Sequence, residues 1–201
     1  MGVGMFKVYA QLNNVEVLNA PLTKETFLFD EKLILKKTTE RTKLIFICSP
    51  NNPTGTSISI EQIKLIAANF KGIVVIDEAY IDFSEKQSAL ELINEFENIV
   101  VLQTFSKAWG LAALRVGVAY GNSFVIEILN KVRSPFNINS NSQELILKAL
   151  EKSAIKDNLV ESILKQKQYL ENELQQLPFV KNITESDANF LLMEVADANN
   201  I

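Results

Sequence analysis

Histidine is absent from this chain of 201 residues. Without an imidazole the chain cannot supply a Ser-His-Asp or Cys-His catalytic unit, a histidine general base or a histidine ligand for zinc. Its single cysteine, Cys48, excludes an intrachain disulfide and a metal site built from several cysteines. We therefore expect a cytoplasmic protein with no metal site, whose chemistry uses Lys, Asp, Glu, Tyr or Ser side chains or a bound cofactor.

Basic charge and long hydrophobic runs are also scarce. The chain has 20 basic and 24 acidic residues, a net charge of −4, whereas nucleic-acid-binding domains usually carry a basic surface. The apolar run at residues 73–76 is far too short to span a membrane. A hydrophobic fraction of 47% and a charged fraction of 22% are typical of globular domains. The composition thus predicts a globular protein with neither nucleic acid nor a membrane as its partner.

Short apolar runs alternate with segments of helical spacing over residues 44–132, the pattern of repeated strand–helix units. Several runs are apolar at every position, as in strands that helices cover on both faces. The sequence therefore predicts an α/β protein of three α/β/α layers around a mostly parallel, mixed sheet, with the first 40 residues adding another strand–helix unit. The predicted strands are 15–18, 44–48, 73–76, 99–105 and 115–120, and the predicted helices are 60–71, 89–96 and 123–132.

After Pro135 the pattern changes to long helical stretches at 143–151 and 155–177, followed by short strands near Val180 and at 190–195. We therefore divide the chain into residues 1–140, a large domain, and residues 141–201, an interdomain helix with part of a small α+β C-terminal domain. The chain begins inside an apparent element and stops just after a strand. We accordingly expect the large domain to be incomplete at its N-terminus and the small domain to be partial.

Two charged residues follow neighbouring predicted strands. Asp77 comes directly after residues 73–76, and Lys107 follows residues 99–105. Because ligands of open α/β sheets bind at the carboxyl ends of the strands, we expect these two side chains to meet there. A helix-capping role for Asp77 remains an alternative. A magnesium-binding role in a nucleotide hydrolase would need a GxxxxGK[ST] loop, which none of the seven glycines forms.

Lys107 stands between Phe105 and Trp109 in the sequence. We expect these aromatic neighbours to desolvate its ammonium group in part, which would favour its use as a nucleophile. The alternative is an ordinary solvated lysine.

A guanidinium and two hydroxyl groups stand near the same predicted strand ends. Arg115 begins the next predicted strand, and Thr104 and Ser106 flank the end of the preceding one. Such groups can bind a phosphate together. Taken singly, each has a structural alternative, since Ser and Thr commonly form turns and Arg commonly forms surface ion pairs.

Four segments together resemble the central motifs of the class I and II aminotransferases, enzymes of fold type I that use pyridoxal 5'-phosphate (PLP). They are Ser-Pro-Asn-Asn-Pro-Thr-Gly at 49–55, Asp-Glu-Ala-Tyr at 77–80, Thr-Phe-Ser-Lys-Ala-Trp-Gly-Leu at 104–111 and Arg-Val-Gly at 115–117. Within that family the first motif, Asp-Glu-Ala-Tyr-Ile at 77–81 and Asp-Ala-Asn-Phe-Leu-Leu at 187–192 are most similar to the histidinol-phosphate aminotransferase branch. The resemblance covers nearly the whole chain and corresponds to the middle of the family's sequence.

The resemblance assigns a role to each candidate residue. It implies that Lys107 binds PLP covalently as a Schiff base and later shuttles the proton at the substrate carbon. It also implies that Asp77 pairs with the pyridine nitrogen, which makes the ring an electron sink. Asn52 and Tyr80 would donate hydrogen bonds to the phenolic oxygen, although an Asn before a Pro is also a common turn element. The phosphate would be bound by Thr104, Ser106 and Arg115.

The implied activity is transamination between histidinol phosphate, a small-molecule amino donor, and the 2-oxo acid 2-oxoglutarate in histidine biosynthesis, by a homodimer. Two alternatives stay open: a PLP-dependent decarboxylase or lyase of the same fold, and a catalytically incomplete fragment that binds the cofactor or dimerises. Arginine occurs only at positions 41, 115 and 133, so nothing after Arg133 can be the arginine with which the family binds the substrate carboxylate or phosphate. The family's N-terminal cofactor-binding loop is likewise not recognisable.

Overall fold

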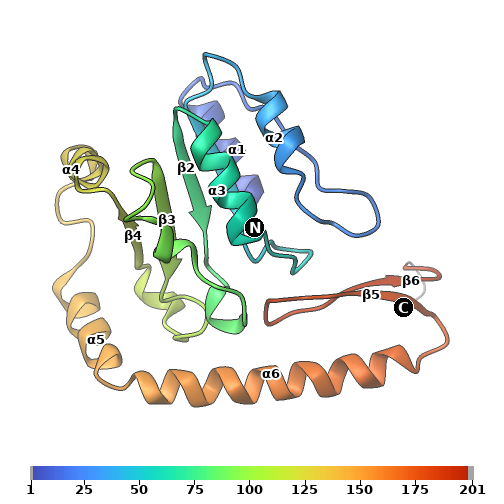
Figure 1. The fold of residues 1–201 in the computed structure, drawn as a ribbon. Coiled ribbons are helices and arrows are strands. Elements are labelled where there is room, and N and C mark those ends of the chain that lie inside the picture. Colours follow the sequence, from blue (N-terminus) through green and yellow to red (C-terminus); the bar gives the residue numbers. More distant parts are fainter. Residues whose placement is uncertain (1, 199–201) are drawn as a thin grey trace.

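A computed structural model describes residues 2–198, and its centre is a four-stranded sheet (Figure 1). The strands are β1 (Leu44–Cys48), β2 (Ile73–Asp77), β3 (Ile99–Thr104) and β4 (Gly117–Gly121), in the order β1-β2-β3-β4. β1, β2 and β3 are parallel, and β4 runs antiparallel to β3. The predicted mostly parallel, mixed sheet is thus confirmed.

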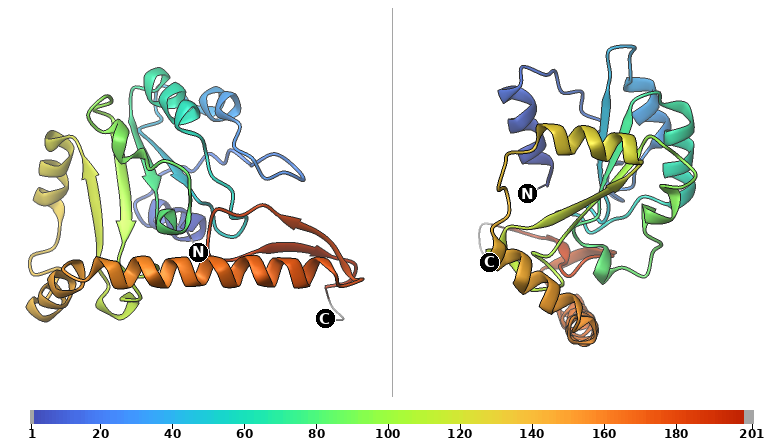
Figure 2. Two further views of the ribbon diagram at one scale, coloured as in Figure 1. Left: turned by 60° about the horizontal axis from the view of Figure 1, so that its bottom comes forward. Right: turned by 90° about the vertical axis from the view of Figure 1, so that its left-hand side faces the viewer.

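Helices lie on both faces of this sheet, which confirms the three-layer architecture. In the right-hand view of Figure 2, α2 (Glu31–Lys37) and α3 (Ile60–Asn69) cover one face and α1 (Gly2–Leu12) lies over the other. On the α3 side, Ile63 and Ile66 join Val74 and Ile76 in the main hydrophobic core. On the α1 side the rings of Phe6 and Phe46 stack with their centroids 4.5 Å apart.

The cover on the α1 side is incomplete. Ile45 and Ile47 of β1 are buried, whereas Leu44 and Phe46 on its other face remain 52% and 45% exposed. Complete burial of both faces, predicted from the unbroken apolar runs, is therefore wrong for β1. The strand lies at the edge of the sheet, where one short helix spans only part of the face.

The second half of the chain is mainly helical. It contains α4 (Ser123–Val132), α5 (Ser140–Leu150), the long α6 (Ser153–Gln175) and an antiparallel hairpin of β5 (Val180–Thr184) and β6 (Leu192–Val195). Figure 1 shows α6 running past the carboxyl ends of the sheet strands, with the hairpin beside it. The predicted helices and strands of this half are confirmed, while the division at residue 140 stays a prediction.

Two sequence-based predictions are wrong. Residues 15–18 form no strand, and residues 2–43 contain only α1 and α2 as regular elements. Val15 and Leu18 are 56% and 49% exposed. The apolar pattern of residues 15–18 formed no strand because no neighbouring strand pairs with it. Residues 89–96 contain only the short 3₁₀ turn η2 (Ala89–Leu92). The buried Glu78 carboxylate accepts hydrogen bonds from the Ala89 amide at 2.6 Å and the Ser88 hydroxyl at 2.6 Å, which fixes this turn in place.

The structure has two further 3₁₀ turns, η1 (Ile81–Phe83) and η3 (Ala112–Leu114). Arg115 directly follows η3 with a φ of 56°, so β4 starts two residues later than predicted. Within residues 2–198, no helix combines the length and the apolar character needed to cross a membrane.

Candidate functional site

The candidate site lies where three parallel strands end. Cys48 of β1 pairs in register with Asp77 of β2, and Asp77 pairs with Leu102 of β3. The loops that follow these strands therefore leave the sheet at the same edge. They carry Asn52, Tyr80 and Lys107, so the predicted meeting of strand-end residues occurs.

Asp77 is half-buried at the end of β2. Burial raises the pKa of its carboxyl group, while a hydrogen bond from the Ala79 amide to Oδ1 at 3.1 Å and the charge of Lys107 act in the opposite direction. The adjacent Cys48 thiol has its pKa raised to about 12 by burial and by the Asp77 charge. At neutral pH the thiol therefore stays protonated, and Asp77 is the acidic group at this edge that can pair with a cation.

Asn52 and Lys107 both contact Tyr80. Asn52 Nδ2 donates a hydrogen bond to Tyr80 Oη at 3.0 Å, and Lys107 Nζ lies 5.1 Å from the centre of the Tyr80 ring. Because Tyr80 Oη accepts from Asn52, its own hydrogen is available for a ligand. The second N–H of the Asn52 amide is a further donor. This corner can thus present two hydrogen-bond donors and an amine to one bound molecule.

The loop that carries Asn52 is held by its own buried polar groups. Asn51 Nδ2 donates to Thr54 Oγ1 at 2.9 Å, and the hydroxyls of Thr54 and Thr56 lie 2.8 Å apart. The Thr56 hydroxyl in turn donates to the carbonyl of Phe27 at 2.8 Å. Gly55 has a φ of 78°, a conformation that favours glycine. These bonds fix the backbone around Asn52, so its position does not depend on a ligand.

Lys107 is exposed, so the prediction that Phe105 and Trp109 desolvate it is wrong for this structure. The rings of Phe105 and Trp109 instead face each other, with centroids 5.5 Å apart, and pack with Val116 and Ile146 in a separate apolar cluster. The chain turns at this point, since the Gly110 amide donates to the Lys107 carbonyl at 2.9 Å. The turn directs the two aromatic side chains inward and the lysine outward.

The three predicted phosphate ligands are only partly brought together. Thr104 Oγ1 accepts a hydrogen bond from the Ser106 amide at 3.1 Å. Arg115 is exposed, and its guanidinium donates to the carbonyl of Ala112 at 3.1 Å, within its own turn. The Thr104 hydroxyl reaches the carbonyl of Val116, the next residue after Arg115, at 3.4 Å. The backbone thus places Arg115 near the two hydroxyl residues, but its side chain would have to turn to bind the same phosphate.

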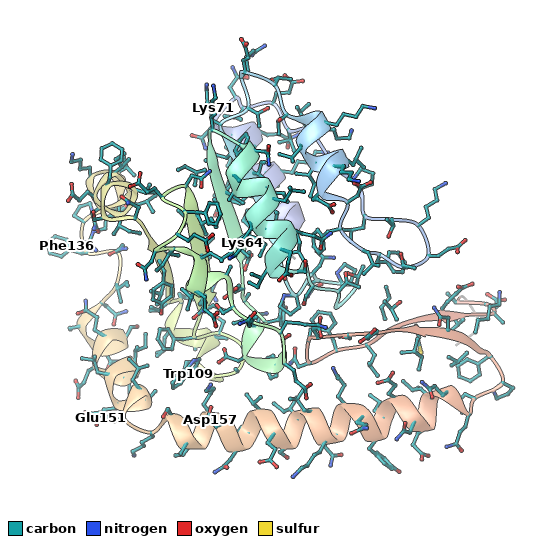
Figure 3. The ribbon with its side chains drawn as sticks, in the orientation of Figure 1. Lys64, Lys71, Trp109, Phe136, Glu151 and Asp157 are labelled. Carbon is teal, nitrogen blue, oxygen red and sulfur yellow. The ribbon has the colours of Figure 1, made fainter. Side chains whose placement is uncertain are left out.

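Sequence reasoning missed two lysines of α6 that contact the site's loops. Lys156 forms ion pairs with Asp82 at 2.9 Å and Asp157 at 2.8 Å and lies 5.5 Å from the Trp109 ring centre. Figure 3 shows Trp109 beside the start of α6, near Asp157. Lys167 donates to two carbonyls of the β5–β6 hairpin. Lys156 and Lys167 are eleven residues apart in the sequence, which corresponds to about three helical turns. This spacing could have indicated from the sequence that both lysines share one face of a helix.

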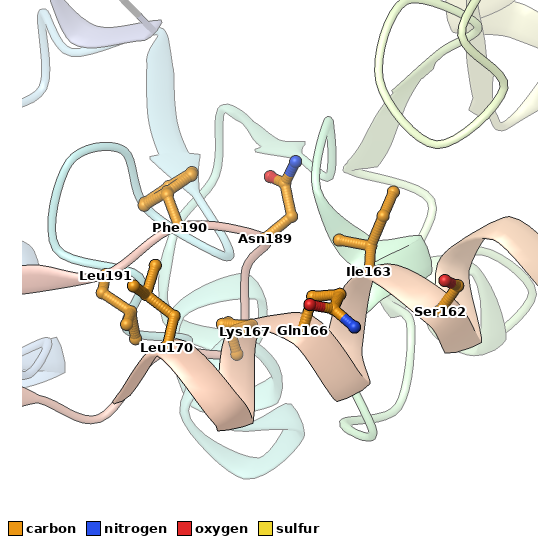
Figure 4. Close-up of a pocket in the computed structure, with 8 residues that line it drawn as sticks. All are labelled: Ser162, Ile163, Gln166, Lys167, Leu170, Asn189, Phe190 and Leu191. Atoms are coloured by element: carbon orange, nitrogen blue, oxygen red, sulfur yellow. The ribbon is translucent and has the colours of Figure 1, made fainter. Parts of the chain in front are cut away.

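Lys167 lines a hollow of about 290 Å³ between α6 and residues 189–191. Its lining is mainly apolar, with Ile163, Leu170, Phe190 and Leu191 among the contributing residues (Figure 4). A second hollow, near Arg133 and Phe136, is remote from the loops of the site. Neither hollow includes Asp77 or Lys107, so the candidate site is an open corner at the strand ends.

Solved structures share this fold. The histidinol-phosphate aminotransferase of Clostridium acetobutylicum superposes with a TM-score of 0.87 at 22% identity, over 94% of this chain and 58% of that one. The histidinol-phosphate aminotransferase of Sinorhizobium meliloti, solved in complex with pyridoxal 5'-phosphate, gives a TM-score of 0.83 at 19% identity, over 96% of this chain and 53% of that one. The fold is therefore that of the fold type I transferases, and the described sheet is part of their large domain.

The sequence comparison assigns the family. The family profile described as "Aminotransferase class I and II" matches residues 4–200, and the chain belongs to this family. The curated histidinol-phosphate aminotransferase of Cytophaga hutchinsonii is 48% identical over 198 residues, which cover 98% of this chain and 57% of that protein. The chain thus spans somewhat more than half the length of such relatives. The resemblance inferred from the motifs is confirmed.

Proposed function

We propose that this chain carries the PLP-binding core of an aminotransferase that exchanges an amino group between histidinol phosphate and 2-oxoglutarate. The observation that carries the proposal is the meeting of Lys107, Tyr80, Asn52 and Asp77 at the carboxyl edge of the sheet. The names of the relatives that match nearly the whole chain support this choice of substrate. A fold alone would leave a decarboxylase or lyase equally open.

The residues at this corner fit the groups of PLP. Asp77 supplies a carboxylate for the protonated ring nitrogen, and Asn52 and Tyr80 supply donors for the phenolic oxygen. Thr104, Ser106 and Arg115 supply hydroxyls and a guanidinium for the phosphate once Arg115 leaves the Ala112 carbonyl. When bound, PLP supplies the electron sink that stabilises the negative charge left on the substrate carbon after proton loss.

Each side chain then has a task in the reaction. Lys107 Nζ would hold the cofactor covalently and would accept and return the proton of the substrate carbon. The exposed position of Lys107 leaves its amine accessible to a bound molecule. Asp77 would pair with the protonated ring nitrogen, and the Asn52–Tyr80 pair would favour the anionic form of the phenolic oxygen.

We also propose the domain organisation and the oligomeric state of the protein that contains this core. Residues 1–140 belong to the large domain, and residues 141–201 form an interdomain helix and part of the small domain, in a cytoplasmic homodimer. The large apolar side chains of Val132 and Phe136, which are 75% and 99% exposed, support an association with a further subunit.

The proposal is tested by adding PLP to the chain, recording its visible absorption, reducing with borohydride and mapping the labelled peptide. We expect a visible band and a label on Lys107. The variant Lys107→Ala should lose the label completely, because Lys107 is the lysine that lies against the Tyr80 ring and whose charge acts on Asp77. The matched control is Lys86→Ala, an exposed lysine remote from the contacts described here, which should label as the unsubstituted chain does.

A label that persists in Lys107→Ala would remove Lys107 from its role. Absence of any band in the unsubstituted chain would favour the reading of a catalytically incomplete fragment. Among substrates, transfer of the amino group of histidinol phosphate, without release of carbon dioxide from any amino acid tested, would distinguish the aminotransferase from a decarboxylase.

A further inference from the structure

The turn that joins β5 to β6, residues 186–190, is closed by its own hydrogen bonds. Ser186 Oγ donates to the Phe190 carbonyl at 2.7 Å and accepts from the Ala188 amide at 3.2 Å. The Ala188 side chain at its centre is completely buried. These hydrogen bonds hold the 186–190 turn in one conformation. A shift at one end of the turn therefore displaces its other end.

This turn contacts two of the loops that form the candidate site. The Asp187 amide donates to the Gly55 carbonyl at 2.9 Å, and a Cβ at Gly55 would collide with Ser186. The Phe190 ring packs edge-on against the Tyr80 ring, with centroids 5.1 Å apart. Tyr80 is thus held between Asn52, through its hydroxyl, and Phe190, through its ring.

On its other side the turn is attached to α6 by Lys167. The Lys167 ammonium donates to the Ser186 carbonyl at 2.6 Å and to the Ala188 carbonyl at 2.8 Å. Burial lowers the pKa of Lys167, against the opposing charges of Glu171 and Asp187. In Figure 4 the side chain of Phe190 projects away from α6, on the far side of the turn from the helix that carries Lys167.

We propose that Lys167 is a positioning residue for the cofactor corner: it fixes the 186–190 turn, and Phe190 on that turn fixes Tyr80. This role rests on the proposed function. Without the ammonium, two carbonyls lose a charged donor and the turn loses its attachment to α6. The Phe190 ring then moves more freely, and the Tyr80 hydroxyl no longer keeps one direction toward the phenolic oxygen of the cofactor.

The test compares Lys167→Met, which keeps the apolar stem, with Lys167→Arg, which keeps a cationic donor. The control is Lys165→Met, which changes a 72% exposed lysine on the same helix that pairs with Glu161. We expect Lys167→Met to raise the dissociation constant for PLP about five- to tenfold, the usual range for a residue that acts through a packed network. Lys167→Arg and Lys165→Met should stay within about twofold of the unsubstituted chain.

Two further readouts separate positioning from general support of the hairpin. The pH midpoint of the visible band should move upward in Lys167→Met, since a less well held Tyr80 stabilises the anionic oxygen less. Without PLP, amide hydrogen exchange of residues 186–190 should accelerate in that variant. Lys167→Gln takes the place of Lys167→Met, with the same expectations, if the latter does not fold.

A double-mutant cycle with Phe190→Leu tests the route of the effect. If Lys167 acts through Phe190, the combined change in the PLP dissociation constant is smaller than the product of the two single changes. Fully multiplicative effects, or a Lys167→Met variant with unchanged PLP affinity and pH midpoint, would overturn the positioning role while leaving the proposed function intact. Failure of the unsubstituted chain to bind PLP on Lys107 would instead overturn the proposed function, and this role with it.

Discussion

The carboxyl group of Asp77 affects the stability of the folded chain through its ionisation. Its pKa is raised in the folded chain by burial, so the folded state binds the proton more tightly than the unfolded state does. The free energy of unfolding therefore falls as the pH rises from the pKa of Asp77 in the unfolded chain to its pKa in the folded chain. It stays lower at every pH above the folded pKa. At neutral pH the ionised Asp77 therefore destabilises the cofactor-free chain.

We predict that Asp77→Asn stabilises the cofactor-free chain at pH 7 and weakens PLP binding at least about tenfold, or about 1.4 kcal/mol. The amide oxygen of Asn can still accept from the Ala79 amide, so the fold keeps that hydrogen bond. Thermal unfolding without PLP at pH 7 and at pH 3 measures the first effect, which should vanish at the lower pH. A lower unfolding temperature for Asp77→Asn at pH 7 would contradict the assigned burial cost.

At the scale of single residues, the sequence predicted which side chains meet but not how each is oriented. Asn52, Asp77, Tyr80 and Lys107 follow strands whose carboxyl ends share one edge, and topology alone brings them together. The exposure of Lys107 follows from the turn at Gly110, and the Arg115–Ala112 hydrogen bond forms within a turn whose backbone is left-handed at Arg115. The residues next to Lys107 and Arg115 in the sequence did not indicate on which side of its turn each of these two side chains lies.

At the scale of elements, α6 is attached to the sheet domain along one face. Val160 packs with Phe83 and Ala108, and Lys156 pairs with Asp82 one helical turn earlier. Burial lowers the pKa of Lys156, but hydrogen bonds to Asp157 and Asp82 outweigh this and leave the pKa raised. A raised lysine pKa contributes stability that is fully present below the unfolded value of about 10.4 and is lost as the pH rises through the folded value.

We therefore predict that Lys156→Met lowers the free energy of unfolding by about 1 kcal/mol at pH 7, the upper end of what a partly exposed ion pair contributes. The difference from the unsubstituted chain should shrink as the pH rises above about 10.4. Urea denaturation at pH 7 and pH 11 measures both values. The exposed pair of Lys165 with Glu161 supplies the control, because Lys165→Met should cost less than about 0.5 kcal/mol. An effect of Lys156→Met that is independent of pH would point to lost packing against Trp109 instead.

Elements with unbroken apolar runs or long helical periodicity were predictable, whereas residues 15–18 and 89–96 were assigned wrongly. β1, β2 and β3 follow from runs of Val, Ile and Leu, and α3 follows from the spacing of its apolar residues after the capping residue Ser59. The turn η2 was mistaken for a helix because its shape depends on Glu78, eleven residues earlier in the chain, which no local pattern contains. Residues 15–18 had strand-like composition but no partner strand.

At the scale of the whole molecule, many large apolar side chains are exposed. Those on α4 and the connection to α5 include Phe124, Val132 and Phe136, with exposed fractions of 69%, 75% and 99%. Figure 3 shows Phe136 on this connection, apart from the sheet and from α6. Large exposed apolar side chains on one segment are candidates for a surface that associates with another subunit.

We predict that the chain self-associates in solution and that replacing Phe124, Val132 and Phe136 together by Ser weakens the association about tenfold or more, since a few buried large side chains carry most of the energy of an interface. Light scattering over a range of protein concentrations measures the mass of both proteins. The control is Tyr169→Ser, which removes a side chain that is 62% exposed on the distant part of α6 and should leave the association unchanged.

If the unsubstituted chain is monomeric at every concentration, these side chains are not an interface, and the support they give to a homodimer is lost. If the triple variant still associates as strongly, the interface lies elsewhere, and the half-exposed face of β1 at Leu44 and Phe46 becomes the next surface to test.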